Sequence, residues 1–514
     1  MQITILDLKS KDDLKEEEAY KLLLSKYKML KGAISSYKLV KKSLDCRDKN
    51  YPIYVYQFVL ETNKRLYLQD KKVLLDTKYT DEINVNRLNR QIRPIIIGSG
   101  PSGLFAAYML VKAGFKPLIF ERGASVIERI KAIDSFFKDD LFDETTNVSF
   151  GEGGAGTFSD GKLNTNLNDP RIRFILKTFV DFGAKENVYY DAKPHVGTDY
   201  LRLFCQNMRT YLINEGAEFK FKTLVSDVRE GYIVANGDKY ESKIIILAIG
   251  HSARDTYQML EKNGFKLEPK PFSMGVRIEH LQKKIDYMQY GNAHIHDPAS
   301  YKAAVHLTDR DVYTFCMCPG GYVVASNSNA NEIVTNGMSY EARDGVNANS
   351  ALLVNVRVDD FYKGSPLDGL AFQAKYEKAC YELTNSYKAP VNLVKEFLID
   401  QVSSEFRSVK PTYPKGFIFT SFKDLLPNFV ITSLKKGIIE LNQKMPGFLD
   451  DDAILTAIES RSSSPVRIVR DSNFETNIKG VYAIGEGAGY AGGITSSALD
   501  GIKCALKIIE RIDK

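Results

Sequence analysis

The feature that most constrains this chain is a glycine pattern set between a short apolar strand and a helix. Gly98, Gly100 and Gly103 form G-x-G-x-x-G within "IIIGSGPSGLFAAYMLVKAG". In such a turn the first glycine makes the tight bend, the second lets the backbone approach a pyrophosphate, and the third allows close helix–strand packing. The N–H groups at the start of the helix favour the anion. Glu121 ends the next strand, 18 residues after Gly103, where a carboxylate would accept the ribose hydroxyls. The pattern predicts a dinucleotide site.

The acidic residue and the far end of the chain narrow the choice of dinucleotide. Glu121 would repel a 2′-phosphate, which leaves NAD or FAD. A second strand–glycine turn–helix pattern follows nearly four hundred residues later, at Gly485–Gly493. The strand in "KIIILAIGHSAR" ends in another glycine turn, as expected of a chain that returns to one sheet. A cofactor contacted from both ends of the chain should be long, which favours FAD.

A third glycine-rich stretch, "GEGGAGTFSDGKLNT", covers residues 151–165 and places five glycines within eleven residues. Such a cluster costs conformational entropy, so it usually marks tight turns or close approach to a ligand. The alternative is a mobile surface loop.

Length and composition set the remaining bounds. The chain has 514 residues, of which 44% are hydrophobic, and this indicates a globular protein of two or three domains. Its formal charge of +6 comes from dispersed lysines and arginines, which does not indicate a nucleic-acid-binding groove. The chain has six cysteines without a CxxC pair and shows no signal-peptide pattern, which favours the cytoplasm. It has no apolar run of about 18 residues, so no membrane span is expected.

We therefore expect an α/β protein with a Rossmann-like FAD-binding domain, interrupted by a mixed α+β substrate domain and preceded by a small α+β domain. The expected ranges are 1–93 for the N-terminal domain, 94–270 and 446–514 for the two parts of the FAD-binding domain, and 271–445 for the substrate or cap domain. Strands are predicted at 2–8, 34–47 and 51–62, a helix at 16–30, and a connector at 72–93.

Several strings resemble the family of uncharacterised FAD-dependent dehydrogenases, within the large glutathione-reductase-type class of flavoproteins. They include "KKSLDCR", "FGEGGAGTFSDGKLNT", "LAIGHSARDTY", "FSMGVRIEH" with "YMQYG", "TFCMCPGGYVV", "ESRSSSPVRIVRD" and "YAIGEGAGYAGGITSSALDG". The resemblance covers most of the chain and implies FAD and the fold rather than a substrate.

The resemblance also implies a set of cofactor contacts. Gly98, Gly100 and Gly103 would hold the pyrophosphate with Ser102 nearby, Glu121 would bind the ribose with Arg122 beside it, and Val225 would meet the adenine through its backbone. Gly250 closes a second flavoprotein-like strand. Related enzymes often carry Gly-Asp where this chain has Gly485-Glu486, a departure of one methylene. The remaining contacts implied are Gly153, Gly154 and Ser159 along the ring, and Gly492, Gly493 and Ile494 at its pyrimidine edge.

Four residues are candidates for catalysis: His251, Arg254, Cys316 and Arg461. His251 could serve as acid or base and Arg254 as an anion binder, or His251 could be structural. Cys316 and Cys318 are either small core residues or contain one thiol that faces the substrate. Arg461, with Arg467, could bind an acidic substrate or form ion pairs in a solvated loop. His294, His296 and Asp297 offer no third ligand in register, so no metal is expected.

The expected function is that of an FAD-dependent oxidoreductase, a dehydrogenase that transfers hydride between a small-molecule substrate and flavin N5. One alternative is an NAD(P)H-driven reductase of unsaturated bonds, with the nucleotide visiting transiently because the sequence indicates no dedicated NAD(P)H domain. A second is an RNA-modifying flavoprotein, although nucleic acid is not the expected partner. A third is a flavin-binding scaffold without turnover. The sequence makes no prediction of oligomeric state.

Overall fold

The computed structural model describes residues 1–64, 70–293 and 295–513. A small N-terminal unit comes first. It is a four-stranded sheet in the order β2-β3-β1-β4, covered by one helix. Its elements are β1 (Gln2–Ser10), α1 (Glu16–Lys26), η1 (Lys28–Leu30), β2 (Ile34–Asp45), β3 (Ile53–Thr62) and β4 (Val73–Leu75). The segment expected as a connector thus begins with a strand that pairs with β1.

The central sheet of the molecule has five parallel strands in the order β23-β11-β5-β6-β7. The strands are β5 (Ile95–Ile97), β6 (Leu118–Phe120), β7 (Glu218–Lys220), β11 (Ile245–Leu247) and β23 (Val481–Ala483). A parallel sheet is covered on both faces, so its inner strands are apolar throughout, as "III", "LIF" and "IIL" are, whereas the edge strand β7 reads "EFK". This is the Rossmann-like fold expected from the glycine pattern.

Alternate residues of these strands feed two separate cores. Ile96 packs with the helices of one face, whereas Ile95 and Ile97 pack with the β-meander and α7 on the other. The first face carries α2 (Pro101–Lys112), α4 (Arg171–Asp181), α6 (Thr198–Asn214) and α12 (Ile494–Asp513). The second carries β8 (Val225–Arg229), β9 (Tyr232–Ala235), β10 (Asp238–Glu241) and α7 (Arg254–Lys262). Between β6 and α6 lie α3 (Val126–Asp139), η2 (Gly154–Phe158) and α5 (Asn187–Tyr190).

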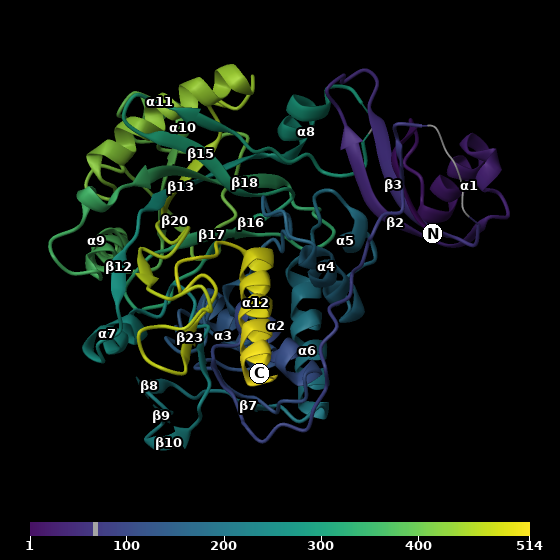
Figure 1. Cartoon of the computed structure of the whole chain (residues 1–514). Helices are drawn as coiled ribbons and strands as arrows, with labels where there is room; N and C mark the ends of the chain where they lie inside the picture. Colours follow the sequence, from purple (N-terminus) through teal and green to yellow (C-terminus); the bar gives the residue numbers. More distant parts are fainter. Residues whose placement is uncertain (65–69, 294, 514) are drawn as a thin grey trace.

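Helices α2 and α12 lie side by side although nearly four hundred residues separate them (Figure 1). Gly501 makes this possible, since a Cβ there would lie 2.2 Å from the carbonyl oxygen of Ser102. The strands that precede them, β5 and β23, run parallel in one sheet, so both helices begin at the same edge and their N-termini face one region.

A seven-stranded sheet forms the second large layer, in the order β14-β15-β18-β13-β21-β19-β20. Its central strand, β13 (Phe272–Leu281), is buried along its whole length and alternates apolar with charged residues. Met274, Val276 and Ile278 pack in the core that includes α11 (Asn428–Lys444), whereas Arg277 and Glu279 point to the opposite face. One face of this sheet is therefore an apolar core and the other a buried polar wall.

The remaining elements complete this layer and its edges. They are β12 (Leu267–Pro269), α8 (Gln282–Tyr290), β14 (Ala304–His306), β15 (Asp311–Cys318), β16 (Tyr322–Ala325), β17 (Thr335–Met338), β18 (Asn347–Val356), η3 (Val358–Asp360), α9 (Asp368–Glu382), β19 (Ala389–Leu393), α10 (Val394–Leu398), β20 (Phe417–Phe419), β21 (Ile454–Glu459) and β22 (Val466–Ile468). The seven-stranded sheet takes in β21, which lies beyond the expected boundary at 446; the chain pairs β22 with β12 and rejoins the Rossmann-like sheet at β23. Among the described residues, no helix is both long and apolar enough to cross a membrane.

Candidate functional site

One large cavity, about 1380 Å³ in volume, lies between the two sheets and reaches the N-terminal unit. Its lining starts at the carboxyl ends of β5, β6 and β11, passes the N-termini of α2 and α12, and ends against β15 and residues 42–47. Most of the residues expected at the site line it: Gly98, Gly100, Ser102, Glu121, Arg122, Gly154, Ser159, Val225, Gly250, His251, Cys316, Arg461, Glu486, Gly492, Gly493 and Ile494. Gly103, Gly153, Gly485 and Arg254 are absent from this lining.

The three glycines of the first turn differ in what a side chain would meet. A Cβ at Gly98, where φ is +105°, would lie 2.2 Å from the carbonyl oxygen of Ala248, and one at Gly103 would lie 2.1 Å from that of Gly98. A Cβ at Gly100 would meet nothing closer than the Cα of Gly154, at 3.8 Å. Gly98 and Gly103 therefore serve the turn and the packing, whereas Gly100 leaves space in the cavity.

Whether a long dinucleotide fits the cavity can be judged from the glycines at which a Cβ would meet empty space. At Gly250 and Gly492 a Cβ would meet no atom within 4 Å, and at Gly493 only the hydroxyl of Ser496 at 3.7 Å. With Gly100 they form a bare wall along the cavity, beside two helix N-termini whose first N–H groups have no partner within their helix. This wall suits a flat ring and a pyrophosphate, so the residues present fit FAD.

Glu121 lies at the end of β6 with its carboxylate fully engaged by backbone and side-chain donors. One oxygen accepts from the N–H and hydroxyl of Ser99, at 3.0 and 2.8 Å, and the other from the N–H groups of Gly123 and Gly151, at 3.0 and 3.1 Å. The carboxylate thus ties the first glycine turn to the start of the 151–165 stretch. Arg122 beside it donates to Asp255 and to Thr256.

The 151–165 stretch is an ordered part of the cavity wall. Gly154 faces Gly100 across the turn, with its Cβ position 3.1 Å from the Gly100 Cα, and Ser159 also lines the cavity. Gly153 instead turns inward, where a Cβ would lie 2.0 Å from the Thr157 hydroxyl oxygen and 2.5 Å from the Cys205 sulfur. Gly153 therefore has a packing role, in a left-handed conformation with φ of +80°.

His251 and Glu486 come from two different glycine turns and meet at the cavity. His251 Nδ1 lies 3.4 Å from a Glu486 carboxylate oxygen. Gly487 lets the two turns approach, since a Cβ there would lie 2.6 Å from the carbonyl oxygen of Gly250. The longer side chain of Glu486, compared with the aspartate common in related flavoproteins, is thus directed at a histidine.

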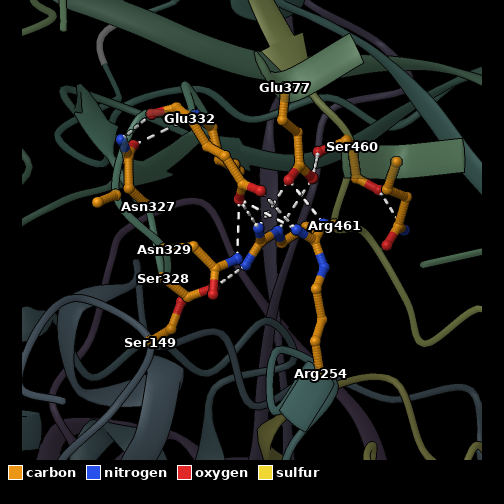
Figure 2. Close-up of polar contacts among 12 residues, drawn as sticks. Ser149, Arg254, Asn327, Ser328, Asn329, Glu332, Glu377, Ser460 and Arg461 are labelled. Atoms are coloured by element: carbon orange, nitrogen blue, oxygen red, sulfur yellow. Dashed lines mark hydrogen bonds and ion pairs between the residues drawn. The ribbon is translucent and has the colours of Figure 1, made fainter. Parts of the chain in front are cut away.

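Arg254 and Arg461 are held together by two buried carboxylates (Figure 2). Arg461 donates to Glu332 at 2.8 Å and to Glu377 at 2.7 Å, and Arg254 donates to the same two residues at 2.8 and 2.7 Å. Burial alone would raise the pKa of Glu377, but Arg461 and Arg254 hold it below its ordinary value. Both guanidinium groups, expected as anion binders, are therefore neutralised within the protein.

Cys316 lies at an irregular point of β15, where a bulge interrupts the pairing with β18 and its φ is +44°. Because of this bulge, Cys316 and Cys318 do not follow the regular alternation of a strand. The hydrogen bond with the Cys318 thiol lowers the pKa of Cys316, burial opposes this, and nearby Lys162 and Arg277 add to the lowering. The Cys316 thiol faces the cavity as a group disposed to ionise.

A buried ion pair that was not expected from the sequence lies next to Cys316. Arg277 on β13 is fully buried and bonds to Glu459 on β21, to the Cys316 carbonyl at 2.9 Å and to Asn349 at 3.0 Å. A lone arginine inside the apolar strand "FSMGVRIEH" is the signal that could have revealed it, because a buried charge needs a partner. Among the described residues, no group of three or more His, Cys, Asp or Glu side chains could hold a metal. His294 lies outside the described residues.

Fold and cavity together define a flavoprotein with a Rossmann-like domain. Residues 96–133 match an NAD(P)-binding Rossmann-like domain, and residues 271–462 match the family described as FAD-dependent protein, C-terminal domain-like. An uncharacterized protein of Clostridium beijerinckii is 41% identical over the whole of this chain, which covers 99% of that relative. The chain belongs to the same family as this protein, a family of FAD-dependent proteins, and FAD is its cofactor.

Solved flavoenzyme structures share a distant likeness. CtdE in complex with FAD is 11% identical, with 82% of this chain and 84% of that chain covered and a TM-score of 0.32. The tetrameric form of 2-methyl-3-hydroxypyridine-5-carboxylic acid oxygenase is also 11% identical, with 83% of each chain covered and a TM-score of 0.33.

Proposed function

We propose that this protein is an FAD-dependent oxidoreductase of the glutathione-reductase-type class that exchanges hydride with a small-molecule substrate. The supporting observation is the single cavity of about 1380 Å³ that joins the glycine turns to the polar wall of the seven-stranded sheet. Ligand pockets usually enclose about 300–1,000 Å³, so this volume leaves room for a substrate beside the cofactor. FAD supplies the hydride acceptor or donor when it is bound.

The chain's own residues orient the ligands and handle the proton. Gly100 and the N-terminus of α2 would hold the pyrophosphate, with Gly98 shaping the turn. His251 is the group we propose to give or take a proton at the cavity wall, with Glu486, 3.4 Å from its Nδ1, fixing the ring's orientation. Arg254 and Arg461 act indirectly. The buried pairs of Arg254 with Glu332 and Glu377 hold α7 against the substrate domain, and Arg461 pairs with the same two carboxylates.

The source of electrons distinguishes the dehydrogenase from its alternative, a reductase fed by NAD(P)H. The later G-x-G-x-x-G strings, at 151–156 and 487–492, contribute to the lining of the same cavity as the first, so a nicotinamide nucleotide would have to enter that cavity. A dehydrogenase reduced by its own substrate needs no such visit. We favour the dehydrogenase for this reason.

The deciding measurement is an anaerobic visible spectrum of the FAD-loaded protein before and after addition of NADH or NADPH. Retention of the ~450 nm band with both nucleotides is the expected result for a dehydrogenase reduced by its substrate. Rapid bleaching by one nucleotide would instead assign the reductase. A protein that cannot be loaded with FAD would refute the proposal.

The proton-handling role is tested in the same experiment with His251→Gln, once a reductant has been found. We expect FAD content to be unchanged and the reduction rate to fall by about 10²-fold, a typical contribution of general acid–base catalysis. His306→Gln is the matched control, because His306 pairs with Asp311 at 2.7 Å on the exposed edge of the seven-stranded sheet. An unchanged rate in His251→Gln would remove this residue from the mechanism.

A further inference from the structure

A cluster of cationic side chains lies in the cavity wall outside the glycine turns. Lys162, Lys193, His195 and Arg343 all line the cavity, next to the stretch of β15 that carries Cys316. None of them was selected from the sequence. They come from three segments far apart in the chain, 160–163, 193–198 and 339–343, so only the fold brings them together.

A short antiparallel pairing sets three of these side chains on one face. The N–H of Leu163 donates to the Pro194 carbonyl, the N–H of Val196 donates to that of Gly161, and Lys162 stands opposite His195. Opposed residues of a ladder share a face, as do residues two apart on one strand. Lys162, His195 and Lys193 therefore project to the same side, which is the side of the cavity.

A single buried carboxylate organises the cluster. Asp160 is fully buried and lies 3.8 Å from Lys162, 3.3 Å from His195 Nδ1 and 3.3 Å from Arg343. It also accepts a hydrogen bond from Ser339. Burial alone would raise the pKa of Asp160, but Lys162, Arg343 and His195 hold it well below its usual range. Asp160 is thus a permanent anion that fixes the cations in place.

One carboxylate does not neutralise the cluster. Lys162, Lys193 and Arg343 carry three positive charges against the one negative charge of Asp160. Burial, together with the nearby charges of Lys162 and Arg343, lowers the pKa of Lys193. The neighbouring Glu341 does not supply the missing anion, since it pairs with Lys185 at 2.6 Å. Lys193 is exposed, and Lys162 and Arg343 are partly exposed along the cavity wall, so an anion in the cavity can balance the surplus charge.

One nitrogen of the cluster lacks a hydrogen-bond acceptor. Within the described part of the chain, Arg343 Nε is buried without a hydrogen-bond partner, whereas His195 Nδ1 faces Asp160 at 3.3 Å. Buried polar groups are nearly always satisfied by protein, water or ligand. The surplus positive charge along the cavity wall and this unused donor both favour an oxyanion as the ligand.

We propose that Lys162, Lys193, His195 and Arg343 bind the carboxylate or phosphate group of the substrate. This rests on the proposed function, because it takes the part of the cavity beside Cys316 as the substrate site. Arginine and lysine are the residues that recognise such groups, and charge-assisted hydrogen bonds to them are the strong ones. The substrate is therefore an anionic small molecule, held by its charged end against the face of Asp160.

Binding of simple anions to the FAD-loaded protein tests this without any turnover. Benzoate, phenyl phosphate and the neutral benzamide are titrated separately, by calorimetry and by the perturbation of the flavin visible band. We expect benzoate or phenyl phosphate to bind at least about tenfold more tightly than benzamide. The tighter of the two anions distinguishes a carboxylate from a phosphate site. Equal binding of benzamide, or no binding of either anion at ~10 mM, would overturn the proposal.

Two variants place the binding on the cluster. Lys193→Met should weaken the anion by about tenfold and Arg343→Met by more, with the FAD content unchanged. Lys193 makes only a 3.5 Å contact with Ser300, so its variant should fold even if Arg343→Met does not. Lys239→Met, on the exposed β9–β10 hairpin, removes the same charge and should bind like the wild type.

The outcomes separate this proposal from the proposed function. Wild-type affinity in Lys193→Met would overturn the subsite. Loss of FAD from both variants would show that the cations hold the cofactor, which also overturns it. If anions bind as expected but no electron donor or acceptor is ever found, the oxidoreductase assignment fails while the anion site stands.

Discussion

At the scale of single residues, the glycine turns show that one motif combines two different requirements. Gly98 and Gly103 have no room for a Cβ, because carbonyl oxygens stand 2.2 and 2.1 Å from the positions it would take. Gly100 has room, and its backbone, with φ of −72° and ψ of −177°, suits any residue. A side chain at Gly100 would therefore occupy space in the cavity.

This contrast predicts that Gly100→Ala folds normally but binds FAD at least about tenfold more weakly. The reason is that its methyl group would fill the space through which the pyrophosphate approaches the backbone. Gly103→Ala is the matched variant, and it should lower the melting temperature because its Cβ would clash with the Gly98 carbonyl. Apo-protein melts and FAD titrations check both. FAD affinity like the wild type in Gly100→Ala would place the cofactor elsewhere.

Site residues could be predicted from the sequence only where they belong to a recognisable motif. His251 and Glu486 each follow a strand that ends in a glycine turn, and neighbouring parallel strands end at one edge, so their meeting could be foreseen. Lys162 and His195 meet through a ladder of only a few residues with no apolar period to reveal it. No sequence motif indicates that Glu332 and Glu377 neutralise Arg254 and Arg461.

At the scale of elements, strand and helix patterns were informative but pairing partners were not. The strand–turn–helix units at β5–α2 and β23–α12 follow from their apolar runs and glycines. The six buried residues of β21 also read as a strand, yet an apolar run does not say which sheet it joins. The structure inserts β21 between β13 and β19, so the seven-stranded sheet extends past residue 446.

The charge cluster of Figure 2 joins α7, through Arg254, to two buried carboxylates that also bind Arg461. Arg461→Met should lower the stability by roughly 3–5 kcal/mol, because it leaves Glu332 and Glu377 buried with one arginine fewer. Lys239→Met breaks an exposed pair with Glu241 and should leave the stability close to that of the wild type. Denaturant unfolding of the two variants measures the difference. Similar losses in both would mean that the buried cluster contributes no more than a surface pair.

At the scale of the whole molecule, the N-terminal unit is docked so that it closes one end of the cavity. The N–H of Ala192 donates to the Lys42 carbonyl at 2.8 Å, and Lys49 donates to the Met288 carbonyl at 2.8 Å, from two different parts of the molecule. Residues 42–47 of β2 and the turn after it thereby line the cavity. The sequence indicated this unit as a separate small domain. Its docking surface combines scattered polar contacts with Val40 and Val59, which pack into the core of the Rossmann-like domain, and so few residues form no periodic pattern in the sequence.

The docked end contains a carboxylate whose charge opposes folding. Burial raises the pKa of Asp191 to about 6, although Asn187 and Lys42 oppose the rise. Because this value lies above the ordinary 3.8, the folded protein binds the proton more tightly than the unfolded chain does. The associated stability is complete below about pH 4 and is lost as the pH rises through 6.

Asp191→Asn should therefore melt at a higher temperature than the wild type at pH 8, by about 2 °C or more, and the gap should close between pH 6 and pH 4. The amide oxygen can keep the 2.8 Å hydrogen bond from Asn187, so only the charge is removed. Asp238→Asn, at an exposed position on β10, is the control and should show no gap that depends on pH. A variant less stable than the wild type at pH 8 would mean that the ionised Asp191 stabilises the docked N-terminal unit, through Lys42 on β2.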